Sequence, residues 1–122
     1  MIHTYILKHE YKSEYVNNII NYQNGGIPNI HFWKIFDKYI DPIELNVLKK
    51  YIQKKYDNND YILIIYDNCV IENFKVLLEI FNLYDTVYGK HNNDNIFIKT
   101  KIQNLNKENQ KINYIYNVDN IL

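Results

Sequence analysis

An acid and an amide stand directly after the most apolar segment of the chain. Asp67 and Asn68 follow Tyr61-Ile62-Leu63-Ile64-Ile65-Tyr66, which has the composition of a strand buried on both faces. A carboxylate in that position can hold Mg²⁺ or Mn²⁺ against the oxygens of a diphosphate, and the Asn can add a carbonyl oxygen. The same two residues also suit an ordinary loop that ends a strand, so the local sequence leaves both interpretations open.

Two further segments carry polar side chains directly after a predicted strand. Lys8-His9-Glu10 follows the strand-like residues 2–7, and Asp37 to Glu44 follows the β-rich residues 30–36. Ligands of open α/β sheets bind beyond the carboxyl ends of the strands, where loop amides and helix N-termini converge. We therefore expect these two segments and Asp67-Asn68 to lie at one edge of the sheet.

The elements that must position these segments alternate between strand and helix. Helical spacing of apolar residues predicts helices over about 11–23, 41–56 and 72–83. The clearest start signal is Asp41-Pro42-Ile43-Glu44, with an acid at the N-cap, Pro at the first helical position and Glu in capping-box register. The order βαβαβα predicts an α/β fold whose first strands are parallel, with 61–66 at the centre of the sheet.

The remainder of the chain is rich in β-forming residues. It predicts strands over 86–88, 96–102 and 112–116, joined by turns over 91–94 and 104–110. A length of 122 residues fits one domain, so we expect a single α/β domain over 1–122 with a β-rich segment over 85–122.

Composition narrows the partners and the compartment. All fourteen basic residues are lysine and fourteen acids balance them, which argues against nucleic acid as a partner. The single Cys69 cannot form an intramolecular disulfide, and no apolar run reaches the length of a membrane span. We expect a soluble cytoplasmic protein, in the host cytoplasm if its genome is viral. The abundance of Ile, Asn, Lys and Tyr, with no Ala, is typical of an AT-rich genome.

Three segments in succession resemble glycosyltransferase family 25, which includes the lipopolysaccharide-type and collagen-type galactosyltransferases. That family has a first strand ending in an Asn-Leu-x-Arg-Arg-like turn, a segment like Leu-Thr-Pro-Gly-Glu-Ile-Gly-Cys, and a strand ending in Leu-Glu-Asp-Asp-x-x-Ile. The matching segments here are 5–10, Ile40-Asp41-Pro42-Ile43-Glu44-Leu45-Asn46 and Ile64-Ile65-Tyr66-Asp67-Asn68-Cys69-Val70-Ile71-Glu72-Asn73-Phe74. The resemblance covers residues 1 to about 82.

This resemblance implies a GT-A-like (Rossmann-like) fold in which residues 1–84 form the nucleotide-sugar-binding half. It implies a donor such as UDP-galactose or UDP-glucose, an acceptor that is a glycan or a protein, and Mn²⁺ or Mg²⁺ at the acidic motif. Asp67 then corresponds to the central metal-binding acid, and Asn68 stands beside it in the motif. Glu44 corresponds to the Glu after Pro-Gly, and Lys8 and His9 stand where the family has two arginines beside the donor.

Other functions remain open at this stage. Tyr66 and Asn68 replace two acids of the family motif, both arginines are absent, and no catalytic base is identifiable. The alternative is a non-catalytic interaction or structural module derived from the same fold, self-associating through an edge of its sheet. A receiver-like phosphoacceptor domain is disfavoured, because the segment after the first strand has Glu10 as its only acid.

Overall fold

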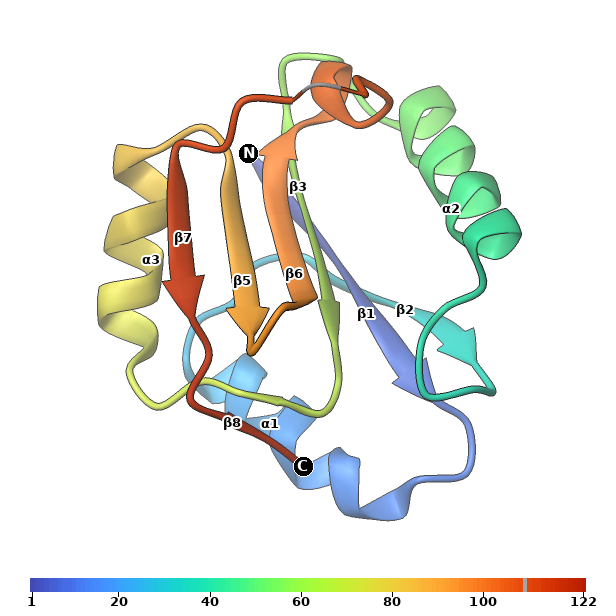
Figure 1. The fold of residues 1–122 in the computed structure, drawn as a ribbon, viewed down its shortest axis with the longest axis vertical. Coiled ribbons are helices and arrows are strands. Elements are labelled where there is room, and N and C mark those ends of the chain that lie inside the picture. Colours follow the sequence, from blue (N-terminus) through green and yellow to red (C-terminus); the bar gives the residue numbers. More distant parts are fainter. Residues whose placement is uncertain (109) are drawn as a thin grey trace.

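A mixed six-stranded sheet with the strand order β2-β1-β3-β6-β5-β7 organises the chain (Figure 1). This computed structural model describes residues 1–108 and 110–122; residue 109, which falls in the predicted turn 104–110, lies outside the described residues. The strands are β1 (Ile2–His9), β2 (Ile30–Ile35), β3 (Tyr61–Tyr66), β4 (Cys69–Val70), β5 (Val87–His91), β6 (Asp94–Lys101), β7 (Tyr114–Asn117) and β8 (Asn120–Ile121). The α-helices are α1 (Val16–Asn24), α2 (Pro42–Lys55) and α3 (Phe74–Leu83), with short 3₁₀ helices η1 (Ser13–Tyr15) and η2 (Ile102–Asn104).

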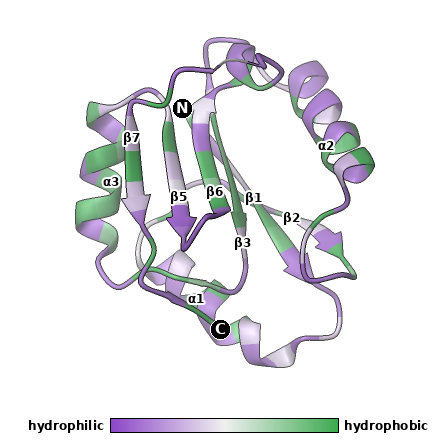
Figure 2. Cartoon of the chain, in the orientation of Figure 1, coloured by the Kyte–Doolittle hydropathy of each residue, from purple (hydrophilic) through white to green (hydrophobic). Residues whose placement is uncertain are grey.

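The predicted α/β class and the parallel arrangement of the first three strands are confirmed. β1 pairs in parallel with β2 on one side and with β3 on the other. β3 lies between β1 and β6, and all of its residues except Tyr61 are buried, which explains its uninterrupted apolar sequence. Figure 2 shows β3 as mostly hydrophobic, whereas the hairpin between β5 and β6 is hydrophilic.

The later strands bring additional loops to the same edge of the sheet. β6 runs antiparallel to both β3 and β5, and β7 runs parallel to β5. β1, β2, β3, β5 and β7 therefore all end at one edge, and β6 begins there. The tip of the β5–β6 hairpin, residues 91–94, consequently lies at the edge where Asp67 follows β3. Asn92 has a φ of 54° in this turn, a left-handed conformation that Asn tolerates well.

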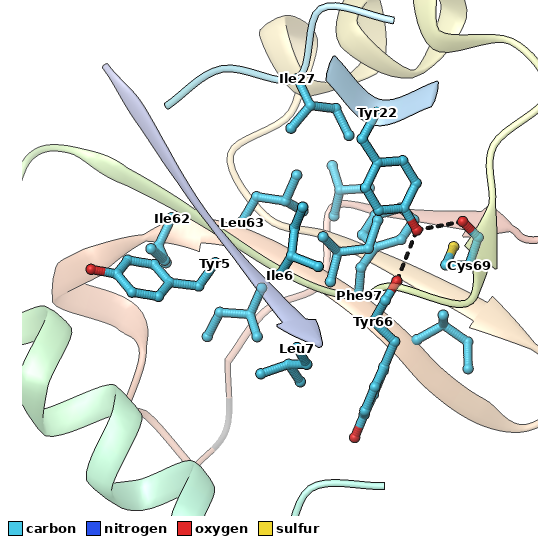
Figure 3. Packing of buried hydrophobic residues seen from close by; sticks show 14 of the residues in the cluster. Tyr5, Ile6, Leu7, Tyr22, Ile27, Ile62, Leu63, Tyr66, Cys69 and Phe97 are labelled. Atoms are coloured by element: carbon cyan, nitrogen blue, oxygen red, sulfur yellow. Dashed lines mark hydrogen bonds between the residues drawn. The ribbon is translucent and has the colours of Figure 1, made fainter. Parts of the chain in front are cut away.

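Helices cover both faces of the sheet. Tyr5 of β1 packs edge-on against Tyr51 of α2, with 6.3 Å between ring centroids. On the other face, Tyr22 of α1 contacts Phe74 of α3 at 6.0 Å. Figure 3 shows α2 and α1 on opposite sides of β1, with the buried apolar side chains between them.

Two of the predicted helix starts are wrong and one is confirmed. α2 begins as expected at Pro42, and the Asp41 carboxylate accepts a hydrogen bond of 2.7 Å from the Ile43 amide. α1 begins at Val16 rather than near residue 11, because the backbone of Lys12 is not helical (φ −109°, ψ 85°) and Ser13–Tyr15 forms a 3₁₀ turn. α3 begins at Phe74 rather than Glu72, because Cys69–Val70 pairs with β8 before Asn73 caps the helix.

No helix among the described residues is long and apolar enough to cross a membrane.

A buried lysine holds the C-terminal end of α3 against the sheet. Lys99 of β6 is 2% exposed, and its Nζ donates hydrogen bonds to the carbonyls of Phe81 (2.8 Å) and Tyr84 (2.6 Å). It also lies 4.1 Å from the centroid of the Tyr61 ring. A cation is favourable at this end of a helix, but burial disfavours the charge and lowers the pKa of Lys99 to about 8.

The lowered pKa of Lys99 predicts a specific dependence of stability on pH. Between the folded pKa of about 8 and the usual 10.5, the unfolded chain keeps a proton that the folded chain has lost. The contribution of Lys99 to the free energy of unfolding therefore rises with pH over this interval. We expect the wild type to gain stability relative to Lys99→Met between about pH 7.5 and about pH 9.5, measured by urea unfolding. A constant difference over that range would contradict the assignment.

Candidate functional site

A cleft of about 610 Å³ opens at the shared carboxyl edge of the strands. The loops that follow β1, β2 and β3 and the tip of the β5–β6 hairpin contribute its walls, together with β8. The side chains that project from these loops are aromatic, cationic, acidic and amide: Tyr11, Lys12, Tyr15, Phe36, Asp37, Lys38, Tyr39, Asn68, His91, Asn92 and Asp94. The cleft lies where the topology of an open α/β sheet predicts a ligand.

Asp67 directly follows β3 at this edge of the sheet and is fully buried. Its Oδ2 accepts a hydrogen bond of 2.9 Å from the backbone amide of His9, and its Oδ1 lies 2.5 Å from His9 Nδ1. The Asp67 amide in turn donates to the Leu7 carbonyl at 3.1 Å. The carboxylate therefore ties the end of β3 to the end of β1.

The His9 ring extends this connection to a third loop. Its Nε2 lies 3.0 Å from the Lys38 carbonyl oxygen, which can only accept, so Nε2 carries a proton. The 2.5 Å contact with Asp67 Oδ1 requires a further proton between that oxygen and Nδ1, and His9 therefore bonds to both loops through one ring. Its side chain is 6% exposed and that of Asp67 is 1% exposed. Three loops, those after β1, β2 and β3, are joined through this pair.

Two side chains of α1 bind the backbone carbonyls of the turn between β3 and β4. The buried Asn18 amide donates hydrogen bonds of 2.7 Å to the carbonyls of Asp67 and Cys69. The Tyr22 hydroxyl contacts the carbonyls of Tyr66, at 2.8 Å, and of Cys69 (Figure 3). These contacts satisfy carbonyl groups that the short β3–β4 turn would otherwise bury without partners.

Asp67 does not fit the predicted role of a metal ligand in this arrangement. Both carboxylate oxygens are taken by donors of His9, and the side chain does not border the cleft. Within residues 1–108 and 110–122, no group of three or more His, Cys, Asp and Glu side chains is placed to hold a metal ion. Mg²⁺ and Mn²⁺ require several accessible oxygen ligands, which the surroundings of Asp67 do not offer.

The other predicted site residues separate into two groups. His9 and Asn68 border the cleft, next to Asp67. Lys8 points to a different part of the sheet, where its Nζ lies 5.7 Å from the centroid of the Phe32 ring. Glu44 accepts a hydrogen bond of 3.2 Å from Trp33 Nε1 and borders a neighbouring groove. Lys8 and Glu44 are thus not brought together with Asp67.

Cys69 is a packed thiol rather than an activated one. It is fully buried in β4, and burial raises the pKa of its thiol to about 12. It is not part of a helix start, so no helix dipole favours the thiolate.

Several cleft residues were not singled out by the sequence. Tyr11 and Lys12 come directly after Glu10, and Lys38 and Tyr39 lie inside the segment predicted to follow the second strand. Their positions just beyond the ends of predicted strands could have identified them as residues of this edge. The hairpin residues His91 and Asp94 carry no such signal, because their turn reaches this edge only through the antiparallel pairing of β6 with β3.

No protein-family model matches the chain, and neither the curated proteins nor the solved structures contain a match to it.

The contacts of the Asp67 carboxylate with His9 predict that its loss will strongly destabilise the protein. Asp67→Ala leaves the backbone amide and Nδ1 of His9 buried without an acceptor, so we expect the free energy of unfolding to fall by about 3–5 kcal/mol in urea titrations. Asp67→Asn keeps one acceptor oxygen and should cost less. The matched control is Asp37→Ala, an exposed acid of the same cleft, which should change stability by less than about 0.5 kcal/mol. An Asp67→Ala variant as stable as the wild type would show that the contacts of Asp67 with His9 do not stabilise the fold.

Proposed function

We propose that this chain is a glycosyltransferase-like domain that binds a nucleotide-sugar donor of the UDP-hexose class in the cleft at the carboxyl edge of its sheet. The observation that carries the proposal is the position of that cleft, formed by the loops after three neighbouring parallel strands. Its volume of about 610 Å³ is within the usual range for small-molecule sites. The resemblance of residues 1–82 to family 25 supports the same ligand class.

In this proposal lysines neutralise the diphosphate without a metal on Asp67. Lys12 and Lys38 are exposed at the mouth of the cleft, on the loops after β1 and β2. Of the acids nearby, Glu10 lies 3.5 Å from Lys34, and Asp94 accepts a hydrogen bond of 3.0 Å from the Tyr39 hydroxyl. Glu10 and Asp94, which border the cleft together with Asp37, thus each have a partner of their own. The chain has no arginine, so lysine is the cation available for this task.

His91 supplies the base for transfer in this proposal. Its Nδ1 lies 2.8 Å from the Val118 carbonyl and therefore carries the proton of the neutral ring, which leaves the Nε2 lone pair as an acceptor. The acceptor hydroxyl attacks the anomeric carbon, the bond from that carbon to the diphosphate oxygen breaks, and the nucleoside diphosphate leaves with the electron pair. The hydroxyl proton passes to Nε2 of His91.

Calorimetric titration with UDP, UDP-galactose and UDP-glucose tests donor binding, with and without Mn²⁺. We expect binding that does not require Mn²⁺ and that weakens at least several-fold in Lys12→Gln and Lys38→Gln, because each loses a charge-assisted contact to phosphate. Lys75→Gln removes an exposed lysine of α3, outside the cleft, and should bind as the wild type does. His91→Gln should retain binding and lose slow hydrolysis of the donor, in which water replaces the acceptor.

Absence of binding at millimolar nucleotide would contradict the proposal. Binding that appears only with Mn²⁺ would contradict the metal-independent arrangement.

A second candidate function is a non-catalytic, self-associating module. The observation that favours it is the edge strand β7, where Ile115 is 47% exposed and Ile112, just before the strand, is 38% exposed. An edge with exposed apolar side chains can pair with another chain. Light scattering across a range of protein concentrations distinguishes this candidate, since a dimer that Ile115→Lys dissociates supports it and a concentration-independent monomer excludes it.

A further inference from the structure

The loops after β1 and β2 share a pattern that the core does not explain. Each loop presents an exposed aromatic ring followed by a lysine: Tyr11 with Lys12, and Phe36 with Lys38. The loop after β2 adds a second ring, Tyr39, whose centroid lies 5.2 Å from Lys38 Nζ. Tyr11 is 83% exposed and Phe36 is 72% exposed. Their ring centroids are 6.3 Å apart, with an angle of 45° between the ring planes. All five side chains border the same cleft.

The exposure of these two rings means that they contribute little to the stability of the fold. A buried Phe contributes a large part of its stabilising effect by leaving water, and Phe36 leaves most of its surface in contact with water. Two such rings in contact form a small apolar surface beside two cations. This combination matches a ligand that joins a flat ring to an anionic group.

The ring geometry defines how such a ligand would contact them. A tilt of 45° at a separation of 6.3 Å leaves no room for a third ring to insert in parallel between the two. A flat ligand ring would instead stack on the face of one aromatic ring and meet the other with its edge. The loops that carry the rings are held together by the His9–Asp67 pair and the Lys38 carbonyl, so the backbones that carry the two rings are held close to each other.

We infer that Tyr11 and Phe36 form the base-binding subsite of the cleft, on which the nucleobase of a nucleoside diphosphate stacks while Lys12 and Lys38 contact its phosphates. This inference rests on the proposed nucleotide-sugar function and adds the orientation of the donor. The base lies at the exposed mouth, and the hexose points inward to the polar side chains of Asn68 and His91. Hydroxyl groups of a sugar match these amide and imidazole groups, whereas a base matches the rings.

Alanine substitution of each ring tests this subsite, with uridine, UDP, UDP-glucose and free glucose as probes. Tyr11→Ala and Phe36→Ala should each weaken UDP binding by about 5- to 150-fold, which is the usual loss for one base-stacking ring. Tyr11→Phe and Phe36→Tyr keep a ring and should bind UDP within about threefold of the wild type. Ile43→Ala removes an apolar side chain that is 76% exposed on α2, outside the cleft, and should leave binding unchanged.

A spectroscopic signature separates stacking from an indirect effect on the cleft. The uracil H5 and H6 resonances of UDP should move upfield on binding to the wild type, because a stacked base lies in the ring current of an aromatic face. These shifts should shrink in both alanine variants, while circular dichroism shows each variant folded. Both rings are exposed, so their loss should not unfold the protein.

Each outcome decides between the subsite and the broader proposal. Wild-type affinity for UDP in both alanine variants overturns the subsite and leaves donor binding intact. Equal weakening of glucose and UDP places the sugar on the rings and also overturns it. A wild type that binds none of the nucleotides overturns the proposed function and the subsite together.

Discussion

The contact between His9 and Asp67 is the constraint on which the arrangement of the cleft depends. It joins the ends of β1 and β3, and through the second nitrogen of the His9 ring it also holds the loop after β2. Parallel strands end at one edge of a sheet, but their loops need not be fixed there. Here one buried His9–Asp67 contact joins all three, and the aromatic and lysine side chains on those loops border one cleft.

The energetics of this pair explain why the surrounding polar groups are arranged as they are. A buried carboxylate is costly unless donors satisfy its oxygens, and His9 supplies one donor to each oxygen of Asp67. The carbonyls of the same turn are satisfied by Asn18 and Tyr22 from α1. Asp67 therefore joins two strand ends, and the polar side chains that border the cleft are those of Asn68 and of the neighbouring loops.

Much of the fold could be predicted from the sequence, because helix starts and buried strands are determined by residues that are neighbours in the chain. The Asp41-Pro42 start of α2 and the buried β3 are set by capping and by burial on both faces. The role of Asp67 could not be predicted, since its partner lies 58 residues away. The placement of Lys8 beside the cleft is wrong because successive side chains alternate along a strand. His9 contacts Asp67, whereas Lys8 lies near the Phe32 ring. The turn of the β5–β6 hairpin is local, but the hairpin reaches the cleft through the pairing of β6 with the distant β3, which no local pattern encodes.

The most direct test of the central claim is a double-mutant cycle between His9→Phe and Asp67→Asn, with the free energy of unfolding measured for the wild type, both single variants and the double variant. If the two side chains form a buried pair that joins β1 to β3, the losses will not add, and the coupling energy will be about 1–3 kcal/mol. A coupling energy below about 0.3 kcal/mol would contradict the account, because it would mean that His9 and Asp67 stabilise the chain independently.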